Sequence, residues 1–142
     1  MVAYSCQKQF APDIQSGVKT HTIRGQRKRH ARVGEQLQLY SGMRTKHCFK
    51  IMPDPVCTFV EPIWITLAEG EIIMIWIGHG QADEILRRDF DRFARLDGFA
   101  DENAMAEFWD DNKTQAIEGT YARQFEGWII GWGKHPLEVL YG

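Results

Sequence analysis

The sequence predicts an α+β fold, most simply a small, partly closed β-barrel with helices added late. Up to residue 77, β-rich segments alternate with short turns, and from Ala82 the apolar residues recur with a helical period. The β-rich segments are not separated by regular crossover helices, which argues against a parallel α/β sheet. These patterns predict five to seven strands and two helices in one domain spanning residues 1–142.

The first third of the chain predicts two strands and a loop. Val2–Phe10 reads as a strand, and 11–17 as one helical turn, with a proline near its start and a glycine just past its end. Lys19–Arg24 is rich in β-branched residues and predicts the second strand. Residues 26–34 have no apolar period and are basic, so we expect an exposed loop.

The middle of the chain predicts a hairpin and two further strands. Residues 35–40 alternate polar and apolar, residues 41–44 form a turn, and 46–52 return as a strand. The β-rich segment 56–67 is interrupted by a proline. Residues 72–77 are apolar on both faces, which is typical of a central strand.

The last third changes to helices before two closing strands. Residues 82–96 present one apolar helical face, and Gly98 can end this helix in the left-handed conformation. Residues 102–111 predict a second helix with Asp101 as its N-cap. The segment 112–124 is ambiguous. Two closing strands are predicted, at 127–132 and 137–141.

Charge is unevenly distributed along the chain. Residues 1–60 hold ten Lys/Arg and three Asp/Glu, whereas residues 61–142 hold seven and sixteen. A basic half favours an anionic ligand such as a nucleotide or nucleic acid, although the two halves could simply attract each other. We therefore expect a nucleoside or RNA as partner and, by default, a monomer.

Several function classes are not indicated. The sequence has no Walker-type phosphate loop, dinucleotide fingerprint or zinc deaminase signature, so we expect neither a cofactor nor a metal. It has no apolar run long enough to cross a bilayer and no secretory leader pattern, which predicts no membrane association and a cytoplasmic location. Cys6, Cys48 and Cys57 are odd in number and widely spaced, as expected in a reducing compartment, and we expect them in the core.

The segment Lys19–Arg24 is the strongest candidate site. In a regular strand, alternate side chains point to opposite faces: Thr20, Thr22 and Arg24 to one, and Lys19, His21 and Ile23 to the other. A threonine hydroxyl becomes a nucleophile when a neutral lysine removes its proton, so Lys19 and Thr22 could form a nucleophile–base pair. They share a face only if the turn after Gly17 reorients Lys19 or a bulge intervenes. The alternative is a solvated edge strand.

Asp97 is a third candidate catalytic residue. It ends the predicted helix at 82–96, where the helix dipole disfavours a carboxylate and would tend to raise its pKa. An unfavourable placement of this kind is compatible with function. A water-exposed aspartate at a helix end is the alternative.

Two further groups of residues could hold a ligand. The candidate substrate-binding residues are Thr20, Arg24, Tyr40 and Arg44, because arginine can clamp a phosphate or base edge and tyrosine can stack on a base. Tyr40 could equally be an amphipathic rim residue. The candidate nucleic-acid-binding residues are Arg27, Lys28, Arg29 and Arg32, although a loop of this composition is often merely solvated. The five tryptophans are expected in the core.

Four motifs together resemble an ASCH domain, a member of the PUA-like superfamily. In chain order they are Gly17-x-Lys19-Thr20-x-Thr22-Ile23-Arg24, Gly34-x-x-Leu37-x-Leu39-Tyr40, Asp97-Gly98-Phe99 and Phe125-Glu126-Gly127. The resemblance covers nearly the whole chain. The turn Tyr40–Arg44 is similar to that of ASCH proteins from bacteriophages and prophages.

The resemblance implies a fold and an activity. The fold is a mixed β-barrel with two or three helices at its rim and a cleft beside the signature strand. ASCH proteins are linked to RNA binding, and one bacterial branch hydrolyses N4-acetylcytidine with a Lys, a Thr three residues later and a Glu after the helix. The matching positions are Lys19 as base, Thr22 as nucleophile and Asp97 as supporting carboxylate, one methylene shorter than glutamate. A non-catalytic RNA-binding module, a ribonuclease and a protein-binding module remain alternatives.

Overall fold

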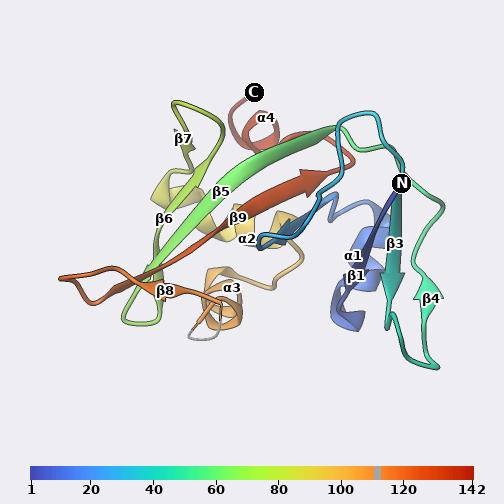
Figure 1. Cartoon of the computed structure of the whole chain (residues 1–142). Coiled ribbons are helices and arrows are strands. Elements are labelled where there is room, and N and C mark those ends of the chain that lie inside the picture. Colours follow the sequence, from blue (N-terminus) through green and yellow to red (C-terminus); the bar gives the residue numbers. More distant parts are fainter. Residues whose placement is uncertain (111–112) are drawn as a thin grey trace.

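The computed structural model describes residues 1–110 and 113–142 and confirms an α+β fold (Figure 1). These residues form nine strands and four helices, more than the five to seven strands and two helices that were predicted. The strands among these residues are β1 (Val2–Cys6), β2 (His21–Arg24), β3 (Leu37–Ser41), β4 (Phe49–Lys50), β5 (Phe59–Ala68), β6 (Glu71–Ile77), β7 (Asp83–Glu84), β8 (Gln115–Ala116) and β9 (Ala122–Gly131). The helices are α1 (Ala11–Ser16), α2 (Phe90–Leu96), α3 (Glu102–Phe108) and α4 (Pro136–Tyr141), with 3₁₀ turns η1 (Lys8–Phe10) and η2 (Arg87–Asp89).

The strands pair as two sheets. The larger sheet has the order β2-β9-β5-β6-β7, with β8 also paired to β9, and the smaller sheet has the order β1-β3-β4. Strands β5 and β9 are antiparallel and paired along their whole lengths, from Phe59 opposite Gly131 to Ala68 opposite Ala122. In the smaller sheet, β1 and β3 are parallel. The site strand β2 therefore lies at one edge of the larger sheet, paired with β9.

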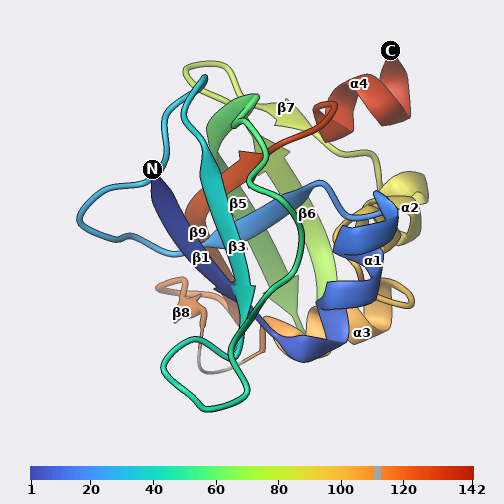
Figure 2. The same cartoon turned by 90° about the vertical axis from the view of Figure 1, so that its right-hand side faces the viewer.

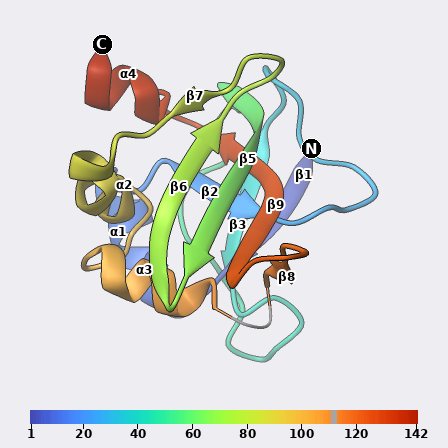
Figure 3. The ribbon, with the colours of Figure 1, turned by 90° about the vertical axis from the view of Figure 1, so that its left-hand side faces the viewer.

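Two hydrophobic cores lie on opposite faces of the larger sheet. Helices α2 and α3 cover one face, as Figure 3 shows, and Phe93 and Ile129 belong to this first core. The smaller sheet and α1 cover part of the other face, as Figure 2 shows, and Leu39 and Ile130 belong to this second core. Ile129 and Ile130 are neighbours on β9, so the alternation of a single strand supplies both cores.

Several predicted elements are shorter than expected. The first strand ends at Cys6, since η1 and α1 follow it directly, and the return strand predicted at 46–52 is reduced to Phe49–Lys50. The helix predicted from residue 82 begins only at Phe90, because Asp83 and Glu84 pair with β6 as β7. The helix predicted at 102–111 ends at Phe108, and its last predicted residue, Asp111, lies outside the described residues.

The end of the chain contradicts the prediction. Residues 137–141, expected as a closing strand, belong to helix α4. Pro136 occupies the first turn and the His135 side chain accepts a hydrogen bond from the Leu137 backbone N–H at 3.1 Å, which together start a helix. Leu137 and Leu140 are three residues apart and pack on the first core, a helical spacing that the short segment concealed.

The ambiguous segment and the interrupted strand are also resolved. Within 112–124, Asn112 lies outside the described residues, and the later part forms β8 and the start of β9. Pro62 does not break β5: it lies opposite Trp128, and its carbonyl accepts a hydrogen bond from the Gly78 N–H at 3.0 Å. Strand β6 is not central, because only the two-residue β7 lies beyond it.

Burial departs from prediction at two residue types. Cys6 and Cys57 are buried as expected, but Cys48 is exposed because it lies in the turn between β3 and β4. Trp109 is in the first core, whereas Trp64, Trp76, Trp128 and Trp132 are half-buried. None of the described helices is long and apolar enough to cross a membrane.

Candidate functional site

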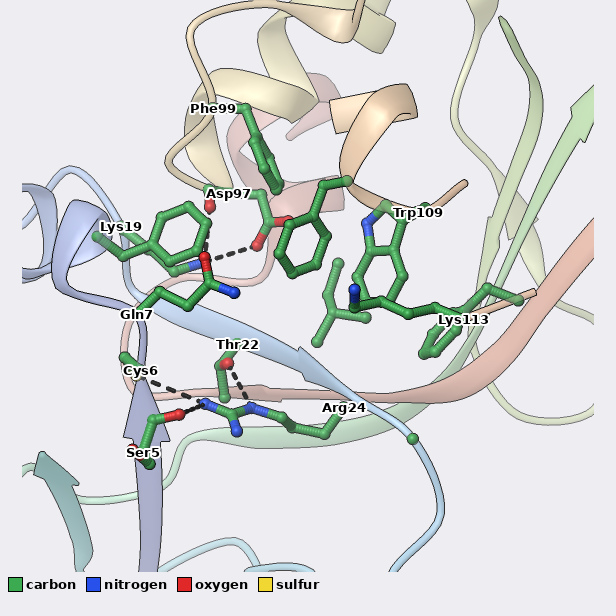
Figure 4. Close-up of a pocket in the computed structure, with 15 residues that line it drawn as sticks. Ser5, Cys6, Gln7, Lys19, Thr22, Arg24, Asp97, Phe99, Trp109 and Lys113 are labelled. Atoms are coloured by element: carbon green, nitrogen blue, oxygen red, sulfur yellow. Dashed lines mark hydrogen bonds and ion pairs between the residues drawn. The ribbon is translucent and has the colours of Figure 1, made fainter. Parts of the chain in front are cut away.

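A cavity of about 430 Å³ lies beside β2, between the end of β1 and the α2–α3 region (Figure 4). Its apolar lining is mainly aromatic: Phe10, Phe99, Phe108, Trp109 and Phe125. Its polar lining includes Gln7, Lys19, Thr22, Arg24, Asp97 and Lys113. In Figure 4, Lys19 and Gln7 lie between Asp97 on one side of the cavity and Thr22 on the other. All three predicted catalytic residues therefore meet in one aromatic-walled cavity.

The turn after α1 places Lys19 in this cavity. Gly17 ends α1 with a left-handed φ of 85°, and the Lys19 N–H then donates to the Asp13 carbonyl at 3.0 Å. Strand β2 begins only at His21, so the side-chain alternation of a strand does not constrain Lys19. The turn after Gly17 thus reorients Lys19, which is one of the two ways in which Lys19 and Thr22 could share a face. Both residues line the same cavity.

Asp97 reaches the cavity from the C-terminus of α2. The Gly98 N–H donates to the Arg95 carbonyl at 3.0 Å and the Phe99 N–H to the Ala94 carbonyl at 2.9 Å, the pattern of a Schellman motif. Gly98 has a φ of +91°, as its predicted left-handed role requires. The motif turns the chain so that Asp97, the last residue before the reversal, is directed to the interior and only 2% exposed.

Lys19 and Asp97 form a buried ion pair. Lys19 Nζ donates to Asp97 Oδ1 at 2.7 Å and to the Asp97 backbone carbonyl at 2.6 Å, and both side chains are 4% exposed. The shorter carboxylate therefore contacts the lysine directly. The exposed-aspartate alternative is wrong.

The expectation that the helix dipole raises the pKa of Asp97 is also wrong. Burial opposes ionisation of this carboxyl, but the Lys19 charge and the His21 imidazole outweigh it and hold the pKa below its ordinary value. Asp97 is therefore an ionised carboxylate at neutral pH.

His21 is a component of the site that the sequence reasoning did not select. Its side chain is 2% exposed and stacks on Phe93 with ring centroids 5.9 Å apart. Nε2 lies 3.0 Å from Asp97 Oδ1, but the contact is not aligned as a regular hydrogen bond. Burial lowers the pKa of His21, with Asp97 opposing the effect, so the imidazole is neutral at pH 7. The strand alternation predicts His21 on the same face as Lys19, and this pattern could have indicated His21 as a site residue.

Thr22 is held by Arg24. Arg24 Nε donates to Thr22 Oγ1 at 2.9 Å, while Nη2 donates to the Ser5 carbonyl at 2.7 Å. The two side chains share a face, as the alternation predicts. Because Thr22 Oγ1 accepts the arginine hydrogen bond, its own proton is available to a base in the cavity.

The other predicted substrate-binding residues do not line this cavity. Thr20 packs against Gly133, where an added Cβ would lie 2.7 Å from Thr20 Oγ1. Tyr40 lies on β3 beneath the Lys50 ammonium, and Arg44 is exposed in the turn after β3 with a φ of 66°. The structure thus brings Arg24 to the catalytic candidates and leaves these three residues elsewhere.

The basic loop also lies outside the cavity lining. Arg29 pairs with Glu35 at 2.5 Å, and Arg29 together with the chain's N-terminus lowers the pKa of Glu35 to about 2. Arg27 lies over the Tyr4 ring at 5.1 Å and donates to the Ala3 carbonyl at 3.3 Å. Lys28 and Arg32 are exposed. Part of the basic density is therefore engaged within the protein.

Comparison of the chain with protein-family models, curated proteins and solved structures finds no match. Among the described residues, no cluster of three or more His, Cys, Asp or Glu side chains is placed to hold a metal ion. The function must therefore be inferred from the cavity and from the motifs that line it.

Proposed function

We propose that the chain is an ASCH-type, PUA-like amidohydrolase that binds an acylated nucleobase, with N4-acetylcytidine as the leading substrate. The observation that carries the proposal is the meeting of Lys19, Thr22 and Asp97 in one aromatic-walled cavity. These positions match the Lys, Thr and carboxylate that the resemblance assigns to catalysis. The packing of a small mixed sheet against a larger antiparallel sheet is compatible with the barrel of that superfamily.

The cavity suits a planar, polar-edged ligand. Aromatic side chains offer flat faces on which a base can stack. Phe99 and Phe108 lie with ring centroids 5.3 Å apart, and Phe10 packs edge-on to Phe99 at 5.2 Å. Convergent polar groups on one side can fix the orientation of the base and of an exocyclic amide.

The proposed chemistry uses the Lys19–Asp97 and Arg24–Thr22 hydrogen bonds and the presence of Lys19 and Thr22 in one cavity. Thr22 Oγ1 attacks the acyl carbonyl carbon, and its proton passes to Lys19 Nζ as Lys19 gives a proton to Asp97. The C–N bond then breaks, the exocyclic amine leaves with that proton, and Asp97 returns its proton to Lys19. Water hydrolyses the threonine ester, releasing the carboxylic acid and the free hydroxyl. Arg24 orients Oγ1 throughout.

The departure from glutamate has a local explanation. Asp97 stands at the end of α2 rather than beyond it, and its carboxylate already lies 2.7 Å from Lys19 Nζ. A longer side chain is not needed at this distance. We propose that aspartate fills the supporting role.

The test is chromatography after incubation of the purified protein with N4-acetylcytidine and a panel of other N-acylated nucleosides. We expect release of the deacylated nucleoside. Thr22→Ala and Lys19→Ala should lose this activity. Thr120→Ala and Lys134→Ala should keep it in full, because these side chains lie outside the cavity lining. Absence of turnover across the whole panel would overturn the proposal.

RNA binding without catalysis is the second candidate. It is favoured by the exposure of Lys28 and Arg32 and by the excess positive charge of residues 1–60. It predicts binding to structured RNA that weakens steeply with salt and on substitution of Arg27, Lys28 and Arg32 by glutamine. Salt-insensitive binding would exclude it. Ribonuclease activity is a third possibility that the same RNA would report as cleavage.

A further inference from the structure

A second hollow of about 620 Å³ adjoins the first and has a different character. The two hollows share Ser5, Cys6 and Gln7, at and just after the end of β1. Beyond this shared rim, Lys8, Ser41 and His47 contribute to the second hollow. The two hollows are therefore neighbours, separated by no more than the residues at the end of β1 that line both.

The second hollow favours an anion. Among the described residues that line it, Lys8 and His47 carry basic groups and none is acidic. Within residues 1–110 and 113–142, neither Lys8 nor His47 forms an ion pair. Arg44 and Lys46 lie in the same turn and are exposed, which adds to the positive field.

One hollow is aromatic and its neighbour is basic, which suits the base and the phosphate of a nucleotide. An amide on the base must face Thr22 in the first hollow, so the ribose leaves the base on a different side. The rim at Ser5–Gln7 supplies a hydroxyl and an amide for the sugar. A phosphate on that sugar would then reach Lys8 and His47.

We propose that the second hollow binds the phosphate of a nucleotide substrate, so that the chain acts on acylated nucleotides in preference to nucleosides. This inference rests on the proposed function for the occupant of the first hollow. The phosphate site itself is carried by the charge and position of the second hollow.

Calorimetric titration with cytidine and with cytidine 5′-monophosphate tests the inference without turnover. We expect the nucleotide to bind about tenfold more tightly at low salt. The double substitution Lys8→Gln/His47→Gln should abolish this preference and leave the cytidine affinity unchanged. The matched control Lys134→Gln removes an exposed charge outside both linings and should keep the preference.

The outcomes separate the two proposals. Equal affinity for cytidine and its monophosphate overturns the phosphate site and leaves the nucleobase cavity standing. Binding of the monophosphate and of inorganic phosphate, but not of cytidine, supports the phosphate site and contradicts the proposed function. Loss of the preference in Lys134→Gln as well would show a diffuse charge effect and overturn the phosphate site.

A third ligand distinguishes the source of the phosphate. A short oligoribonucleotide with one internal cytidine carries phosphodiesters in place of the monoester. Tighter binding of the monophosphate assigns a free nucleotide, and tighter binding of the oligoribonucleotide assigns a strand. Either result supports a phosphate next to the base, whereas weaker binding of both than of cytidine contradicts it.

Discussion

At the scale of single residues, the site is built around one buried carboxylate. Asp97 Oδ1 accepts a hydrogen bond from Lys19 Nζ at 2.7 Å and lies 3.0 Å from His21 Nε2. A buried charge is tolerated only when it is paired. The carboxylate therefore fixes both the lysine and the imidazole, and its removal should affect stability as well as chemistry.

Asp97→Asn should lower the free energy of unfolding by about 3–5 kcal/mol, because the Lys19 charge stays buried without a counter-ion. Denaturation in urea measures it. Asp54→Asn, which breaks the exposed pair with Lys50, is the matched control and should cost about 1 kcal/mol or less. A loss in Asp97→Asn no greater than that of the control would contradict the buried ion pair.

The buried imidazole of His21 predicts a pH dependence of stability. The pKa of His21 is below 6.5 in the folded protein and near 6.5 when unfolded, so the unfolded chain binds the extra proton between these values. The free energy of unfolding should therefore fall as the pH drops below 6.5, by at most about 1.4 kcal/mol per pH unit from this group. Asp97 contributes in a lower window, because its stabilisation is lost only as the pH falls below 3.8.

Urea denaturation at several pH values between 4 and 8 measures this dependence. His21→Gln should show a shallower slope below pH 6.5 than the parent protein. Some slope should remain, since burial also lowers the pKa of His30. Identical slopes in the variant and the parent would exclude a buried neutral His21.

At the scale of elements, two glycine-terminated helices bring the catalytic candidates together. Gly17 ends α1 and releases Lys19 from the alternation of β2, while Gly98 ends α2 and turns Asp97 inward. The sequence predicted both helix ends, because glycine after an apolar period is a strong stop signal. Local patterns did not predict that the two ends meet, since the pairing of distant turns depends on tertiary packing; only the ASCH resemblance implied that Lys19 and Asp97 act together.

Gly98→Ala should be more destabilising than its backbone conformation alone explains. An added Cβ would lie 2.8 Å from Phe10 Cδ1 and 3.0 Å from Lys19 Cδ, so the Phe10 ring has to shift and the lysine has to give way by a few tenths of an ångström. Gly119→Ala is the control, because Gly119 also has a positive φ but an added Cβ meets nothing within 4 Å. We expect the free energy of unfolding to fall by about 1 kcal/mol in Gly119→Ala and by more in Gly98→Ala. Activity should be lost only in Gly98→Ala.

Thermal denaturation and the N4-acetylcytidine assay measure the two effects separately. Equal destabilisation of the two variants with unchanged activity would show that the Gly98–Lys19 contact does not matter to the site.

The elements that sequence alone misplaced share a physical cause. Asp83 and Glu84 form a strand only because β6 is beside them, and 137–141 is too short for its period to separate helix from strand. By contrast, the alternation at Leu37 and Leu39 correctly predicted two fully buried side chains. The local alternation was enough to predict the burial of Leu37 and Leu39. Edge pairing and the structure of short terminal segments depend instead on neighbours distant in sequence.

At the scale of the whole molecule, the cavity lies where both halves of the chain meet. Lys19, Thr22 and Arg24 come from the basic first 60 residues, and Asp97 comes from the acidic remainder. The charge asymmetry of the sequence is thus used within the protein at this ion pair, and it also leaves the exposed basic residues that favour an anionic ligand. The attraction between the halves is seen at this ion pair, whereas an anionic ligand stays a prediction.

The sharing of β9 by both cores predicts cooperative unfolding. Ile129→Ala and Ile130→Ala remove fully buried side chains from opposite faces of the same strand and should each cost about 2–5 kcal/mol. In each variant, the transitions followed by circular dichroism and by tryptophan fluorescence should coincide. Separate transitions, with one core unfolding before the other, would contradict a single domain.

We propose that the hydroxyl of Thr22, oriented by Arg24 and assisted by Lys19 and Asp97, performs the chemistry. The most direct test is kcat/KM for N4-acetylcytidine in the parent protein, Thr22→Ser and Thr22→Ala. We predict that Thr22→Ala loses about three orders of magnitude or more while remaining folded, and that Thr22→Ser, which keeps a hydroxyl, retains measurable turnover. Turnover by Thr22→Ala at the parent rate would contradict the account.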